Sequence, residues 1–81
     1  MATIFFPKSF QAQTGGIDQV EVEALDIRGV FRALEARFPA LGDRLRGGIA
    51  VAIDGEIVND PLLEPVGPDS QIHFLPPISG G

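Results

Sequence analysis

The clearest structural signal in the chain is the run Ile49-Ala50-Val51-Ala52-Ile53-Asp54-Gly55-Glu56-Ile57-Val58. In its first half, large β-branched residues alternate with alanines, which indicates a strand whose large side chains share one face. Asp54-Gly55 is a favoured pair for the tight turn between two antiparallel strands. The run therefore predicts a strand, a hairpin turn and a short return strand.

Three further segments have the composition of strands. Residues 2–6 form an apolar, β-favouring run that stops at Pro7. Residues 18–24 alternate between apolar and acidic residues, so we expect one buried face and one solvated face. Residues 70–75 alternate as well, which predicts that Phe74 points inward and Leu75 outward.

One segment has the period of an amphipathic helix. Asp26 is a good N-cap, and apolar residues follow it at spacings of three and four: Ile27, Val30, Phe31, Leu34 and Phe38. Pro39 predicts that this helix ends at Phe38. Leu41 and Leu45 then predict core contacts from a short helical or irregular segment. Residues 7–17 contain Pro7 and Gly15-Gly16 and predict a long connecting loop.

The order of these elements is strand, strand, helix, strand, short strand, strand. This order within 81 residues predicts an α+β fold of two layers, with one main helix across a mixed sheet of four or five strands. The β-grasp, or ubiquitin-like, arrangement matches it best. We expect one domain over residues 1–75, followed by a C-terminal tail over residues 76–81.

Composition excludes several classes of chemistry. The chain has no cysteine, so disulfides, zinc–thiolate sites, iron–sulfur clusters and a cysteine nucleophile are ruled out. A net charge of −5 argues against a nucleic-acid partner and favours a basic surface on another protein. No secretory signal and no apolar stretch long enough to span a membrane is visible, so we expect a cytoplasmic protein.

The sequence ends on Pro76-Pro77-Ile78-Ser79-Gly80-Gly81. The two prolines favour an extended, stiff backbone after the last strand. The two glycines have no Cβ, so the terminal carboxylate of Gly81 could pass along a channel too narrow for any side chain. The alternative is a frayed terminus or an expression remnant.

With this ending, the chain resembles the ThiS/MoaD group of prokaryotic ubiquitin-like sulfur carriers. The resemblance covers the whole chain and is carried by Ile4-Phe5-Phe6, by residues 52–58 and by residues 74–81. It implies that Gly81 is adenylated by a partner that uses ATP and is then converted to a thiocarboxylate. Pro76, Pro77, Ile78, Ser79 and Gly80 would enter the partner's channel, and the carrier itself would bind no permanent cofactor.

The resemblance also implies a partner interface on the exposed sheet face, at Phe6, Ile57 and Leu75. Strand alternation places Phe6 and Leu75 on the outward side, where exposed apolar residues mark contact surfaces. The alternative is that residues 7–17 or 59–68 cover them. The implied partners are a ubiquitin-activating-like adenylyltransferase and a sulfur-accepting synthase.

The resemblance favours the small subunit of molybdopterin synthase, because Pro76-Pro77 is similar to that branch. The loop Thr14-Gly15-Gly16 is closer to carriers that serve a cysteine synthase, and residues 66–70 replace the usual turn before the last strand. Thiazole synthase for thiamin is a third acceptor. A ubiquitin-like modifier joined to target lysines through Gly81, or a plain interaction module, is the alternative function. In each case we expect a carrier or binding protein rather than an enzyme by itself.

The remaining polar residues favour no catalytic or metal site. His73 is the sole histidine and is expected on the surface. Asp54, Glu56 and Asp60 lack the spacing of a calcium loop, and residues 44–48 lack the ending of a phosphate loop. No catalytic triad and no metal site are expected.

Overall fold

Five strands form one mixed sheet in the order β2-β1-β5-β3-β4. In the computed structural model, which describes residues 1–47, 49–59 and 61–75, these strands are β1 (Ala2–Phe5), β2 (Gln19–Val22), β3 (Ala50–Ile53), β4 (Glu56–Val58) and β5 (Gln71–Leu75). Strand β5 lies between β1, to which it is parallel, and β3, to which it is antiparallel. The predicted hairpin is confirmed, because β3 pairs with β4 around a turn in which Asp54 and Gly55 have φ of 50° and 89°.

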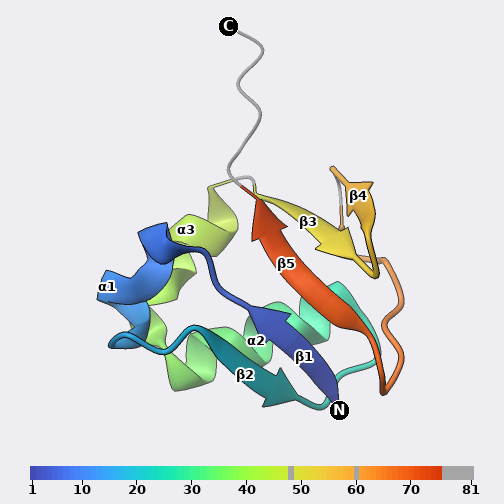
Figure 1. Ribbon diagram of the computed structural model, residues 1–81, viewed down its shortest axis with the longest axis horizontal. Helices are drawn as coiled ribbons and strands as arrows, with labels where there is room; N and C mark the ends of the chain where they lie inside the picture. Colours follow the sequence, from blue (N-terminus) through green and yellow to red (C-terminus); the bar gives the residue numbers. More distant parts are fainter. Residues whose placement is uncertain (48, 60, 76–81) are drawn as a thin grey trace, which may run out of the picture.

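Helix α2 (Ile27–Arg37) crosses behind the sheet in the view of Figure 1. Its first turn is capped by Asp26, whose Oδ1 accepts a hydrogen bond from the Gly29 backbone nitrogen at 2.8 Å. Ile27, Val30 and Leu34 are fully buried against the sheet. The predicted amphipathic helix is therefore confirmed, and it ends at Arg37, one residue before the position that Pro39 suggests.

The predicted loop over residues 7–17 is wrong. This segment contains a short 3-10 helix, η1 (Lys8–Phe10), and a single turn of helix, α1 (Gln11–Thr14). Phe10 and Thr14 are buried, and the Thr14 hydroxyl donates to the Ile17 carbonyl at 2.8 Å. The segment therefore closes one side of the core, and Gly15 and Gly16, both at positive φ, turn the chain into β2.

A second connection completes the helical layer after α2. It consists of the 3-10 helix η2 (Pro39–Leu41) and the short helix α3 (Gly42–Arg46). Leu41 and Leu45 are buried in the core, as their positions in the sequence predict. None of the described helices is long and apolar enough to cross a membrane.

The outward position predicted for Phe6 is wrong, since only 7% of its surface is exposed. Ala2, Ile4 and Phe6 follow one another on the helix-covered side of β1 and its extension. The Phe6 ring lies against Phe10, Phe38 and Phe74, with centroid distances of 6.4, 5.7 and 6.1 Å. The physical reason is that η1 and α2 bring aromatic rings over the end of β1, so Phe6 belongs to the core and Phe5 to the opposite face.

Candidate docking face and C-terminal tail

The residues to which the sequence assigns the chemistry lie outside the described residues. These are Pro76, Pro77, Ile78, Ser79, Gly80 and Gly81. What the structure does describe is the point from which they continue. Strand β5 ends at Leu75, which pairs with Ala50 of β3, so the C-terminal tail is attached to the central strand of the sheet.

The sheet face opposite the helices faces the viewer in Figure 1. Strand pairing aligns one row of residues across all five strands on this face, namely Gln19, Phe5, His73, Ala52 and Ile57. Leu75 and Ala50 form the next pair on the same face, toward the end of β5. We call these seven residues the open face.

Phe5 and His73 form the centre of the open face. Their rings stack with centroids 4.4 Å apart and planes 7° apart. His73 is exposed, as the sequence predicts. Among the described residues, no group of three or more His, Asp and Glu side chains could hold a metal ion. The stacked pair therefore forms a flat, partly apolar platform rather than a ligand set.

Two of the three predicted interface residues lie on the open face. Ile57 is 61% exposed on β4, and Leu75 is half-buried at the end of β5. Phe6 lies in the core, and Phe5 takes its place on β1. Sequence reasoning missed Phe5 because both residues are phenylalanines and no side of residues 2–6 is marked by charge.

A groove of about 460 Å³ lies on the helical side of the molecule, between α2, α3 and the residues Asn59, Pro61 and Leu62. Its apolar lining includes Phe31, Leu45 and Ile49. The charged groups at the groove, Arg46 and Glu35, pair with each other at 3.0 Å. Because this pair already satisfies both charges, the groove presents no group that identifies a ligand, and we assign it no part in the site.

The ThiS family model matches residues 4–81 of the chain. No curated protein sequence matches it. Among solved structures, similar chains occur in the BexX/CysO complex of Amycolatopsis orientalis (TM-score 0.86, 24% identity, 100% of each chain covered), and in CysO of Mycobacterium tuberculosis (TM-score 0.86, 19% identity, 96% of this chain and 100% of that one). The small archaeal modifier protein 1 of Methanosarcina acetivorans is also similar (TM-score 0.82, 19% identity, 99% and 95% covered).

These similarities agree with the strand order, the parallel β1–β5 pair and the helix across one face, and they confirm the two-layer α+β, β-grasp fold. The family match extends over the open face and through the C-terminal glycines. The chain is a member of the ThiS family.

Proposed function

We propose that this chain is a sulfur carrier that acts through the carboxylate of Gly81. The observation that carries the proposal is the family match, which runs to the last residue of the chain and includes both terminal glycines. The absence of cysteine from the sequence fits this role, because the sulfur would be held by the chain end and not by a thiol.

The proposed chemistry has two steps. A carboxylate is a poor electrophile, so its oxygen first attacks the α-phosphate of ATP and forms an acyl-adenylate with release of pyrophosphate. Hydrosulfide, or an equivalent sulfur donor, then attacks the acyl carbon and displaces AMP, which leaves a thiocarboxylate and releases a proton. The activating partner supplies ATP and the catalytic groups, whereas this chain supplies one positioned reactive end. Because ATP is consumed, we place the reaction in the cytoplasm.

The tail is well suited to a deep partner site. Gly80 and Gly81 have no side chains, and Ser79, Ile78, Pro77 and Pro76 connect them to the domain. In the proposal these residues occupy a channel while the domain remains outside. Attachment to the central strand β5 supports this, because β1 pairs with β5 as far as His73 and β3 pairs with it as far as Leu75, the last residue before the tail.

The open face is the proposed contact surface for the partner. It carries the stacked Phe5–His73 pair and the exposed Ile57, and Leu75 extends it to the start of the tail. A protein that binds this apolar face would thereby align the tail with its active site. The proposed interface residues are thus Phe5, Ile57 and Leu75, with Phe6 serving the core.

The proposed partners are a ubiquitin-activating-like adenylyltransferase and a synthase that accepts the sulfur. For the acceptor we retain the large subunit of molybdopterin synthase, with cysteine synthase and thiazole synthase as the competing classes. Each can be tested by mixing the purified thiocarboxylate with one acceptor and its substrate. The correct acceptor converts the thiocarboxylate back to a carboxylate in a substrate-dependent reaction.

The similarity to small archaeal modifier protein 1 favours a second candidate, a protein modifier joined through Gly81 to lysines of other proteins. Lys8 is the only lysine of this protein, so a bond between Gly81 of one copy and another copy would have to form at Lys8 or at the N-terminus. The modifier predicts ladders of conjugates in cell extract that require Gly81. A Lys8→Arg variant should leave conjugates to other proteins in place and remove only those between copies at Lys8.

The first step can be tested by ATP–pyrophosphate exchange with an adenylating enzyme of the ubiquitin-activating type. We expect exchange to depend on this chain and to be lost when Gly81 is removed. A variant that lacks Gly81 and supports the same exchange would contradict the proposal.

A further inference from the structure

Positive and negative charges are separated between the two layers of the domain. The five strands contain neither lysine nor arginine. All six basic residues lie in helical segments, namely Lys8 in η1, Arg28, Arg32 and Arg37 in α2, and Arg44 and Arg46 in α3. The sheet side therefore presents carboxylates without compensating cations from its own strands.

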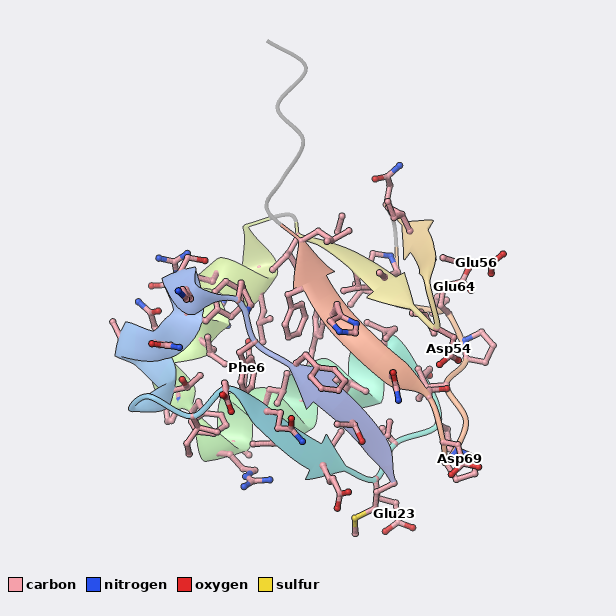
Figure 2. All side chains as sticks on the ribbon, in the orientation of Figure 1. Phe6, Glu23, Asp54, Glu56, Glu64 and Asp69 are labelled. Carbon is pink, nitrogen blue, oxygen red and sulfur yellow. The ribbon has the colours of Figure 1, made fainter. Side chains whose placement is uncertain are left out.

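The carboxylates near the open face gather toward one end of it. Glu21 of β2 lies on the same side as the open face, because it pairs with Thr3, two residues from Phe5 on β1, and Thr3 pairs with Gln71 at the start of β5. Glu56 pairs with Ile53, so its side chain lies on the other side of β4 from Ile57, at the edge of the sheet. Figure 2 shows Asp54, Glu56, Glu64 and Asp69 along the β4 side of the sheet, down to the beginning of β5. Glu23 lies beyond the end of β2, at the lower edge of the same view. Asp69 immediately precedes Ser70 and β5, whereas the C-terminal tail follows the other end of that strand.

The acidic groups and the tail are thus at opposite ends of the central strand. Strand β5 has five residues, and at about 3.3 Å per residue its ends are about 13 Å apart. The apolar centre of the open face, with Phe5, His73 and Ile57, lies between them. Along β5, the carboxylates therefore lie near the start of the strand, the apolar residues at its middle and the tail after its end.

From this order we infer that the open face binds a partner protein whose contact surface has an apolar centre and a basic patch. The basic patch lies on the side of that surface away from the channel that receives the tail. The inference rests on the proposed function and names the electrostatic character and the orientation of the partner. Opposite charges draw the two proteins together and exclude a docking pose turned by half a revolution, because only one pose brings the basic patch to the carboxylates.

Two other occupants fit the charges less well. A second copy bound face to face about a two-fold axis would bring two sets of carboxylates toward a shared interface, which is unfavourable. A nucleic acid would place phosphates near the same groups. The helical side carries the basic residues, but there Arg46 is engaged by Glu35 and Asp43, at 3.0 and 3.2 Å.

The test compares two triple variants that change the net charge equally. The first, Glu21→Gln, Glu56→Gln and Asp69→Asn, neutralises three carboxylates at the end of the sheet where β5 begins. The matched control, Asp18→Asn, Glu35→Gln and Asp43→Asn, removes three carboxylates elsewhere. Asp54 is left intact because its Oδ1 accepts a hydrogen bond from the Gln71 backbone nitrogen at 2.9 Å. Melting curves of both variants verify that they are folded.

The readout is the association rate with the adenylating enzyme that converts the wild-type chain to a thiocarboxylate, measured at low and high salt. We expect the first variant to associate about tenfold more slowly at low salt and to approach the wild type at high salt. We expect the control to stay within about twofold of the wild type. Equal rates for both variants, at every salt concentration, would overturn the inference and leave the carrier role intact. Failure of the wild-type chain to be thiocarboxylated by any such enzyme would overturn the proposed function and the inference with it.

Discussion

Phe5 and Phe6 are neighbours in the chain but belong to opposite faces of the sheet. Phe5 stacks on His73 at 4.4 Å on the open face, and Phe6 lies 5.7 Å from Phe38 within the core. A strand alternates its side chains, so one peptide unit separates a residue available for docking from a residue that holds the two layers together.

The first prediction concerns this pair. Phe6→Ala should cost about 3–5 kcal/mol of unfolding free energy, because it leaves a cavity beside three aromatic rings, those of Phe10, Phe38 and Phe74. Phe5→Ala should cost clearly less, because its ring is already partly exposed. Urea denaturation of the two variants measures the difference directly. Equal losses, or a larger loss for Phe5→Ala, would mean that the two faces are assigned the wrong way round.

A second prediction tests the open face as a contact surface. Ile57→Ser removes an exposed apolar side chain at the edge of the row, so the free energy of unfolding should change by only about 0.5 kcal/mol. Affinity for the adenylating partner should fall about tenfold, equivalent to about 1.4 kcal/mol. Leu63→Ser is the matched control, since Leu63 is 82% exposed but lies outside the open face. Calorimetric titration should show weaker binding only for Ile57→Ser, and the same affinity for both variants would exclude Ile57 from the interface.

A third prediction concerns the start of α2. Asp26→Ala removes the acceptor for the Gly29 backbone nitrogen and should lower the free energy of unfolding by about 1 kcal/mol. Asp26→Ser should keep most of the stability that Asp26→Ala loses, because a serine hydroxyl caps a helix about as well as an aspartate carboxylate. Thermal melts of the two variants provide the comparison. If alanine and serine destabilise equally, the side-chain cap contributes little.

A fourth prediction separates the tail from the domain. Removal of Gly80-Gly81 should abolish sulfur transfer and leave the melting temperature nearly unchanged, because the part of the chain that the structure describes already forms a closed hydrophobic core from residues within 2–74. Differential scanning calorimetry of the shortened and complete chains tests the second part. A clear drop in melting temperature would show that the tail stabilises the domain.

The sequence correctly predicts those helices and strands whose local pattern agrees with their environment in the fold. The β3–β4 hairpin has both alternation and a turn pair, and α2 has a capping residue, apolar spacing and a following proline. The family resemblance, carried by residues 4–6, 52–58 and 74–81, is confirmed by the match over residues 4–81.

Sequence reasoning was wrong where long-range packing decides the structure. Residues 8–14 contain too short a periodic pattern to identify η1 and α1, yet Phe10 meets Phe6 and Phe74 across the core. The same contacts bury Phe6, which the local alternation could not orient. The separation of charge was also missed, because it depends on β3 pairing with both β4 and β5, which brings the carboxylates of the β3–β4 hairpin to the end of the sheet where β5 begins.

The intact mass of the protein shows whether Gly81 carries sulfur. The chain is incubated with ATP, an adenylating enzyme of the ubiquitin-activating type and a sulfur donor, with a variant lacking Gly81 treated in parallel. We expect a mass gain equal to the replacement of one oxygen by one sulfur, in the complete chain alone. An unchanged mass, with an enzyme shown to act on this chain by pyrophosphate exchange, would contradict it.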